Sequence, residues 1–129
     1  MRVVFDANIV ISALVFPGKQ ADKAFTAIIE GRDRLLISKP IVNEVVQVLA
    51  RKFARDTEEL ARVAVLLADP GEMIVPSRRI SLLTDDADNR ILECAVRKAY
   101  LIVTGDQKMP GLGSFEQIGL VSLRQYLRS

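Results

Sequence analysis

The sequence predicts an α/β fold, a three-layer α/β/α sandwich in which helices cover both faces of a central parallel sheet of about five strands. Two observations predict it. Short segments rich in Val, Ile and Leu recur along the chain, as is typical of strands buried on both faces. Segments with apolar residues at helical spacing lie between them, and this alternation is characteristic of βαβ units. The 129 residues suit one domain, 1–129.

Five short apolar segments account for the predicted strands. Each is three or four residues long, as expected for strands that cross a small domain. Pro76 follows the third segment, so we expect that strand at an edge of the sheet. The segments are 3–5, 35–37, 73–75, 101–104 and 120–123.

Amphipathic helices are predicted between these strands, because apolar residues recur there every three or four positions. Local signals set their ends. A break at 16–18 interrupts the first helix, Gly31 stops the second, and Pro40 suits the first turn of the third. Asp56 and Glu59 have the spacing of a capping box at the start of the fourth. The helices are expected near 8–14, 21–29, 40–53, 56–68 and 88–99.

Histidine is absent from the chain, and Cys94 is the single cysteine. The absence of histidine excludes Ser-His-Asp and Cys-His catalysis and the common zinc sites. Any bound metal must therefore have oxygen ligands, which Mg²⁺ and Mn²⁺ prefer. One cysteine permits no internal disulfide, and neither a membrane-spanning run nor a secretory signal is present. We expect a cytoplasmic protein with no membrane partner.

Four acidic residues fall where the predicted fold brings them to one edge of the sheet. Asp6 and Asp106 follow the first and fourth strands, at the carboxyl ends where open parallel sheets bind ligands. Glu44 lies in the early turns of the helix after the second strand, and Asp88 opens the helix before the fourth. Carboxylates gathered there repel one another, so some should have raised pKa values unless a cation joins them. The predicted metal would activate a water and neutralise charge on a phosphate.

Each of these acids also has a purely structural interpretation. Asp6 and Asp88 could be helix N-caps, where aspartate is among the preferred residues. Asp106 could be a turn residue after Gly105. Glu44 could be an acid stabilised by the helix N-terminus. The set of four outweighs these separate explanations, because nothing in them accounts for acids at one edge of one sheet.

The residues around the third acid are assigned structural roles. We expect Asp85 and Asp86 to cap the helix or to be solvated. Glu93 and Arg97 have the spacing and order of a favourable i,i+4 ion pair, so Glu93 is not assigned to the site. The effect of Glu93→Gln on activity should be mild by comparison with that of Asp6→Asn. Cys94 is expected to be a small core residue.

Several segments resemble the motifs of PIN-domain nucleases. Residues 4–14 (VFDANIVISAL) look like the opening motif of that family, and Glu44 matches its second acid. Residues 88–95 (DNRILECA) resemble the third motif, and residues 102–106 (IVTGD) resemble the fourth. The motifs occur in the family's order and spacing over nearly the whole chain. The branch that the sequence resembles comprises VapC-related toxin components of toxin–antitoxin systems.

This resemblance implies a PIN-like sandwich with strand order 3-2-1-4-5 and a Mg²⁺- or Mn²⁺-dependent endoribonuclease that hydrolyses phosphodiester bonds of single-stranded RNA. It also implies a homodimer and a cognate antitoxin protein, a segment of which enters the site. The toxin role follows from analogy alone, whereas the nuclease role also follows from the site. Catalysis and metal binding are assigned to Asp6, Glu44, Asp88 and Asp106, and hydrogen-bonding support to Asn8, Ser12 and Thr104.

Three other functions compete with this interpretation. A haloacid-dehalogenase-type phosphatase would need a second acid two residues after Asp6, where Asn8 stands. A response-regulator receiver would need an acid pair near the end of the first strand and a phosphoacceptor after the third, where Pro76 stands. The third alternative is a PIN-fold module that binds RNA or a protein without cleaving it. It predicts RNA binding that is unaffected by chelation.

The charge outside the predicted site suits a phosphodiester substrate. The chain has a net charge of +2, and without the four site acids its 18 basic residues face 12 acidic ones. We expect some basic residues in predicted loops to contact RNA phosphates. Aromatic residues make up only 5%, which argues against extensive base stacking. The basic residues are Lys19, Lys39, Arg78, Arg79 and Lys108.

Overall fold

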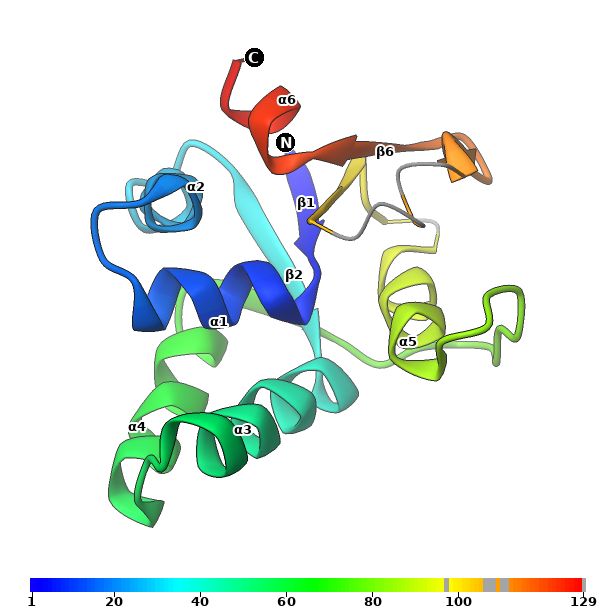
Figure 1. Ribbon diagram of the computed structural model, residues 1–129. Helices are drawn as coiled ribbons and strands as arrows, with labels where there is room; N and C mark the ends of the chain where they lie inside the picture. Colours follow the sequence, from blue (N-terminus) through cyan, green and yellow to red (C-terminus); the bar gives the residue numbers. More distant parts are fainter. Residues whose placement is uncertain (97, 106–108, 110–111, 129) are drawn as a thin grey trace.

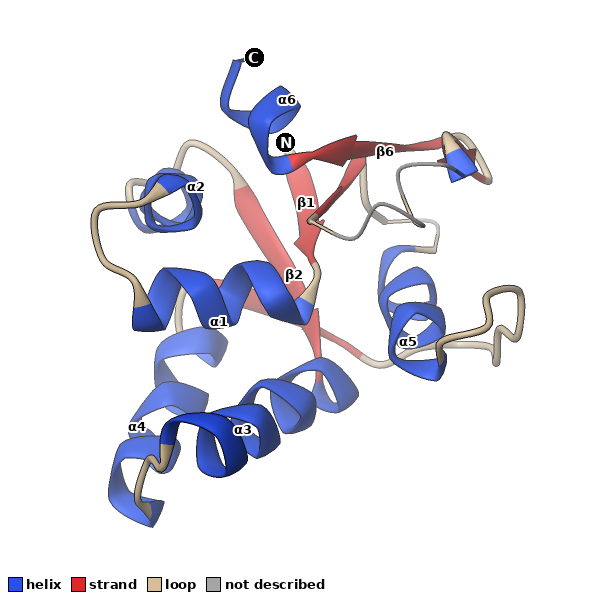
Figure 2. Ribbon diagram, in the orientation of Figure 1, coloured by secondary structure: helices blue, strands red, loops and turns tan. Residues whose placement is uncertain are grey.

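The computed structural model describes residues 1–96, 98–105, 109 and 112–128. In this part of the chain, strands and helices alternate, and helices surround a central sheet (Figures 1 and 2). The strands are β1 (Arg2–Phe5), β2 (Arg34–Ser38), β3 (Gly71–Ile74), β4 (Leu101–Thr104), β5 (Ser114–Phe115) and β6 (Ile118–Ser122). The helices are α1 (Ala7–Val15), α2 (Gln20–Ile29), α3 (Lys39–Phe53), α4 (Thr57–Ala68), α5 (Asp86–Ala95) and α6 (Leu123–Arg128).

The six-stranded sheet has the order β3-β2-β1-β4-β6-β5. Its first five members are parallel to their neighbours, and only β5 pairs antiparallel, with β6. The predicted order 3-2-1-4-5 is confirmed, since the predicted fifth strand corresponds to β6. The third strand lies at an edge, as Pro76 indicated. Strand β5 was not expected, because two residues give no apolar pattern to recognise.

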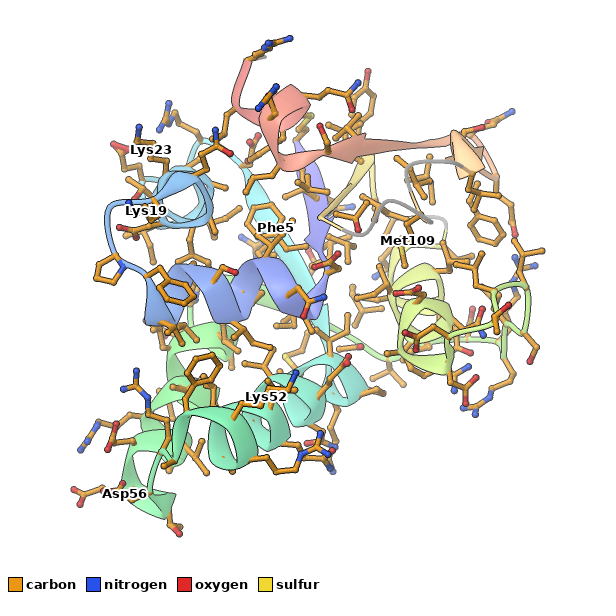
Figure 3. The ribbon with its side chains drawn as sticks, in the orientation of Figure 1. Phe5, Lys19, Lys23, Lys52, Asp56 and Met109 are labelled. Carbon is orange, nitrogen blue, oxygen red and sulfur yellow. The ribbon has the colours of Figure 1, made fainter. Side chains whose placement is uncertain are left out.

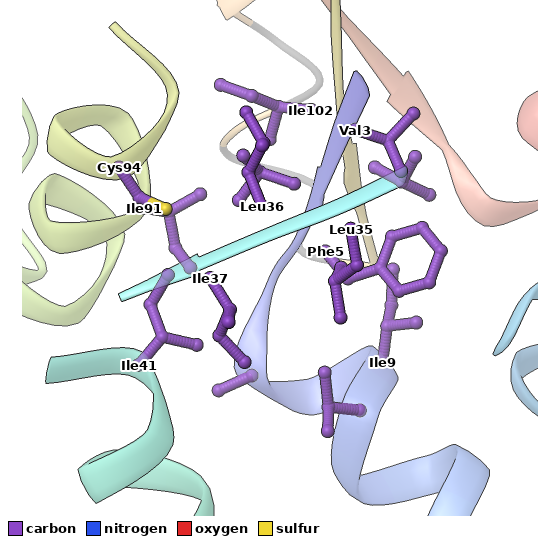
Figure 4. Close-up of a cluster of buried hydrophobic side chains, with 14 of the residues drawn as sticks. Val3, Phe5, Ile9, Leu35, Leu36, Ile37, Ile41, Ile91, Cys94 and Ile102 are labelled. Atoms are coloured by element: carbon purple, nitrogen blue, oxygen red, sulfur yellow. The ribbon is translucent and has the colours of Figure 1, made fainter. Parts of the chain in front are cut away.

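The core lies on both faces of the sheet, because successive side chains of a strand point to opposite sides. In Figure 4, Leu35 of β2 lies with Phe5 and Ile9 on the side of α1. Its neighbour Leu36 lies on the other side, toward Ile91 of α5. All five side chains are almost fully buried. Strands covered by helices on both faces are expected to be apolar throughout, which explains the continuous apolar runs in the sequence.

The helices differ from the sequence-based prediction mainly at their ends. Helix α5 ends at Ala95 rather than near Ala99, because the chain leaves the helix there to reach β4. Just before that strand, the Tyr100 N–H donates to the carbonyl oxygen of Arg2 at 2.8 Å. Ile29, expected in the apolar stripe of α2, is 56% exposed at the end of that helix. Helix α6 was not predicted. None of the described helices is long and apolar enough to cross a membrane.

Candidate active site

A small polar cavity of about 50 Å³ lies where the chain passes from the carboxyl edge of the sheet into α1, α3 and α5. Figure 1 shows the first turns of these three helices meeting beside the end of β1. The volume is sufficient for a water molecule or a cation. Four acidic side chains line the cavity together with Ala7, Asn8, Ala87 and Ile91, and these acids are Asp6, Glu44, Asp85 and Asp88. Three of the four predicted site acids therefore share one cavity.

Asp6 has a carboxylate whose orientation is fixed by three donors. The residue is 4% exposed and caps α1, where its Oδ1 atom accepts a hydrogen bond from the Ile9 N–H at 3.0 Å. Its Oδ2 atom accepts from the Thr104 hydroxyl and from the Gly105 N–H, the latter at 3.1 Å. A carboxylate offers about four lone pairs, so these bonds leave capacity for a further ligand. The capping interpretation and the site interpretation of Asp6 are therefore compatible.

Glu44 lies in the second turn of α3 and is half-buried at the cavity. Burial raises the pKa of its carboxyl group above the usual 4.5, and the negative charges of Asp85 and then Asp6 raise it further. Repulsion between site acids, expected from the sequence, thus adds to the larger effect of burial at this residue. The cause matters, because a cation in the cavity would offset the repulsion between these charges.

Helix α5 brings two acids to the cavity, where the sequence predicted one. Asp85 is the N-cap of α5, and its Oδ1 atom accepts from the Ala87 N–H at 3.0 Å. This finding excludes Asp88 as the cap and places it in the first turn, where it is 9% exposed. Sequence reasoning missed Asp85 as a cavity residue because capping already explained it. The signal that could have revealed it is the i,i+3 spacing of Asp85 and Asp88, which places both near one face of the helix.

The three predicted supporting residues have different positions. Thr104 is fully buried at the end of β4 and donates to Asp6, as a supporting residue should. Asn8 is exposed and lines the cavity. Ser12 lies one turn further along α1 and is not among the residues that line the cavity. The fourth predicted acid, Asp106, lies outside the described residues.

The donor chemistry of the cavity fits a hard divalent cation, because every charged group that lines it is a carboxylate. Asp6, Glu44 and Asp88 would hold Mg²⁺ or Mn²⁺ together with Asp106. Within the described residues, no three acidic, cysteine or histidine side chains are close enough to form a metal site by themselves. A cation in this cavity would need ligands in addition to these described acids.

Glu93, which follows on α5, is buried rather than solvated. Its Oε2 atom accepts from the Ile80 N–H at 2.7 Å, and its Oε1 atom lies 2.9 Å from Nε of Arg90. The expected partner Arg97 lies outside the described residues. Glu93 thus forms a buried i,i+3 pair with Arg90, which the spacing argument did not anticipate. The next residue, Cys94, is fully buried as expected, and burial raises the pKa of its thiol to about 12.

The predicted RNA-contacting residues are spread around the molecule. Lys39 is the first residue of α3, so its assignment to a loop was wrong. Arg78 forms an ion pair with Glu116, and Arg79 lies 4.0 Å from Glu93. Figure 3 shows Lys19 beside α2, at the end of α1 that points away from the cavity. Lys108 lies outside the described residues.

Comparison with known proteins agrees with this geometry. A family model described as PIN domain matches residues 2–108. The chain is 26% identical over 116 residues to "Uncharacterized protein MJ1680" of Methanocaldococcus jannaschii, an alignment covering 87% of this chain and 75% of that protein. A crystal structure of VapBC2 from Rickettsia felis, bound to a DNA fragment from their promoter, contains a similar fold. The structural alignment covers 95% of this chain and 98% of the matched chain, with a TM-score of 0.69 and 14% sequence identity.

The cavity acids, the strand order and the family match together define the class of protein. The chain belongs to the PIN-domain family. The structural similarity to the Rickettsia felis protein confirms the fold, a mostly parallel sheet between helices.

Proposed function

We propose that this protein is a metal-dependent ribonuclease that hydrolyses phosphodiester bonds of single-stranded RNA. The observation that carries the proposal is the convergence of carboxylates from three separate elements on one small cavity. Asp6, Glu44 and Asp88 would hold Mg²⁺ or Mn²⁺ with Asp106, and Asp85 adds negative charge beside them. Membership of the PIN-domain family supports the assignment.

The described residues prepare the cavity for this chemistry. Three hydrogen bonds fix the Asp6 carboxylate, so little reorganisation is needed when a ligand binds. Burial raises the pKa of Glu44, and repulsion from Asp85 and Asp6 raises it further. That repulsion gives the cavity a preference for positive charge. A bound Mg²⁺ or Mn²⁺ would supply Lewis acidity, lowering the pKa of a water and offsetting the charge of the phosphate. The buried Thr104 hydroxyl donates to Oδ2 of Asp6, and this hydrogen bond opposes rotation of the carboxylate.

We further propose that the protein is the toxin of a toxin–antitoxin pair in the cytoplasm. The motif resemblance to VapC-related toxins supports this role, as does the similarity to a protein solved as VapBC2. A cognate antitoxin and a homodimer would then be its protein partners. This part of the proposal rests on analogy of fold and motif, whereas the nuclease activity rests on the cavity.

The proposal is tested by incubating the purified protein with a pool of single-stranded RNAs, with Mn²⁺ or with EDTA. Asp6→Asn removes a charged ligand at nearly constant volume, and asparagine caps a helix as well as aspartate does. We expect this variant to cleave at least about 10³-fold more slowly. The control is Asp56→Asn, the same change at the N-cap of α4, which should cleave like the wild type. RNA binding that persists in EDTA, without cleavage in Mn²⁺, would instead favour the non-cleaving module.

A further inference from the structure

The segment between β3 and α5 reaches the cavity without any strand or helix of its own. Its backbone groups must therefore find other partners where they are buried. At Leu83, the side chain of Asn89 bonds both the backbone N–H and the backbone carbonyl group. The Leu83 N–H donates to Oδ1 of Asn89 at 2.8 Å, and Nδ2 of Asn89 donates to the Leu83 carbonyl oxygen at 2.9 Å. Asn89 is 2% exposed, so water cannot readily replace these bonds.

A second attachment lies three residues earlier on the same segment. The Ile80 N–H donates to Glu93, and the Ile80 carbonyl oxygen accepts from the Arg90 guanidinium at 3.0 Å. Asn89 and Glu93 are four residues apart, so they lie on one face of α5. Asn89, Arg90 and Glu93 together take the place of a neighbouring strand, because they bond the N–H and the carbonyl group of both Leu83 and Ile80.

The attachment at Leu83 is the one that concerns the cavity. Leu83 lies two residues before Asp85, and Asn89 lies one residue after Asp88. The bidentate bond therefore closes a short loop of chain that contains both acids contributed by α5. Asp85 is oriented in turn by its bond to the Ala87 N–H. Opening the loop would release the chain that leads into Asp85 and the first turn that carries Asp88.

We propose that Asn89 is a positioning residue of the cation site, which holds Asp85 and Asp88 at the cavity by bonding the backbone of Leu83. The inference rests on the proposed function, since it assigns Asn89 to the metal site of that function. Residues that orient metal ligands without touching the metal commonly affect metal affinity by 10–100-fold. A residue that serves stability alone would not change metal affinity while the protein stays folded.

The test compares Asn89→Ala with a variant matched for local chemistry. Asp56→Ala also removes a side chain that bonds a backbone N–H near a helix start, that of Glu59 at 2.8 Å. Figure 3 shows Asp56 at the outer end of the α3–α4 pair, far from the cavity. Mn²⁺ binding is measured by titration calorimetry at a temperature where thermal unfolding shows every variant to be folded. Asp6→Asn is measured in parallel as a variant of a metal ligand.

We expect Asn89→Ala to bind Mn²⁺ at least about 10-fold more weakly than the wild type, and Asp56→Ala to bind it as the wild type does. Equal weakening in both variants, or none in Asn89→Ala while Asp6→Asn is impaired, would overturn the role of Asn89 and leave the proposed function standing. A wild-type protein that binds no Mn²⁺ would instead overturn the proposed function, and the assignment of Asn89 to a metal site with it.

Amide hydrogen exchange in EDTA provides a readout that needs no metal. In Asn89→Ala, the amides of Leu83 and Ala87 should exchange at least about 10-fold faster, because both bonds depend on the closed loop. Asp56→Ala should leave them unchanged. Faster exchange at Leu83 alone, with Ala87 still protected, would contradict the claim that Asn89 holds Asp85 in place.

Discussion

The Thr104 hydroxyl donates a hydrogen bond to the Oδ2 atom of Asp6, and this bond joins residues 98 positions apart in the sequence. The pairing follows from the sheet. Strands β1 and β4 are parallel neighbours, with Phe5 opposite Val103, so the residues that end each strand lie side by side. The Asp6 N–H also donates to the Val103 carbonyl oxygen at 3.1 Å, which holds the two chain ends at this point.

Removing that hydroxyl should impair both the site and the stability of the fold. Thr104→Val has nearly the same shape but leaves one of the donors to Asp6 missing. We expect Mn²⁺ affinity to fall by about 10-fold or more, and stability by about 1–3 kcal/mol. Thr104→Ser keeps the hydroxyl and should retain most of the affinity. Titration calorimetry and urea unfolding measure the two effects, and equal Mn²⁺ affinity in the valine and serine variants would refute the role of the hydroxyl.

Asp85→Asn separates the two roles of this residue. Asparagine caps a helix as well as aspartate does, so α5 should remain intact. The lost charge no longer attracts a cation, and we expect Mn²⁺ affinity to fall several-fold, with the effect reduced by added salt. Asp56→Asn, the same change at the cap of α4, is the control and should bind Mn²⁺ normally. If Asp85→Asn also binds normally, Asp85 is only a cap.

Glu44→Gln should alter the pH dependence of stability. Because the folded pKa of Glu44 is raised, the folded protein keeps this proton to higher pH than the unfolded chain does. Stability is therefore lost as the pH rises through the folded pKa. In EDTA at pH 7 the variant should be more stable than the wild type by up to about 1 kcal/mol, since the group is partly exposed. The difference should vanish below about pH 4.

Urea unfolding at several pH values measures this difference. A glutamine variant less stable than the wild type at pH 7 would mean that Glu44 is instead held by favourable interactions with the helix N-terminus. Mn²⁺ should stabilise the wild type more than the variant, because the cation binds only the folded protein and loses a ligand in the variant.

Glu93→Gln should be clearly destabilising. The substitution removes the nearer of the two described carboxylates beside Arg90, whose side chain is 14% exposed, and leaves only Asp86 at 3.8 Å. Breaking such a pair should cost about 2–3 kcal/mol of unfolding free energy. The control is Glu58→Gln, which removes an exposed i,i+4 pair with Arg62 and should change stability by less than about 0.5 kcal/mol. Equal effects in urea unfolding would show that the Glu93 pair is worth no more than a surface pair.

Cys94 should be chemically inert in the folded protein. Burial raises its pKa to about 12 and hides its sulfur, so almost no accessible thiolate exists at pH 8. A thiol reagent such as iodoacetamide should label one site per chain in urea and none in buffer over the same time. Rapid labelling in buffer would show that the α5 region opens readily.

The sequence was sufficient for the elements whose signals are local. The apolar run at 3–5 and the capping spacing of Asp56 and Glu59 depend on neighbouring residues alone, and both predictions are confirmed. Strand β5 and helix α6 gave no such signal, because they are short and carry little periodicity. The buried pair of Arg90 and Glu93 was missed for another reason. Spacing along a helix shows which residues can pair, but it does not show which face of the helix other segments cover.

The absence of histidine and the positions of the acids were enough to predict a site of carboxylate ligands, because residue types and their order can be read directly from the sequence. Which groups line the cavity, and which groups hold them there, depended on how the elements pack. Asp85 lines the cavity whereas Ser12 does not, and Asn89 forms hydrogen bonds with the backbone of Leu83. These arrangements depend on contacts between segments that are distant in the sequence. The contacts form when the sheet and α5 pack together, so no local sequence pattern reveals them.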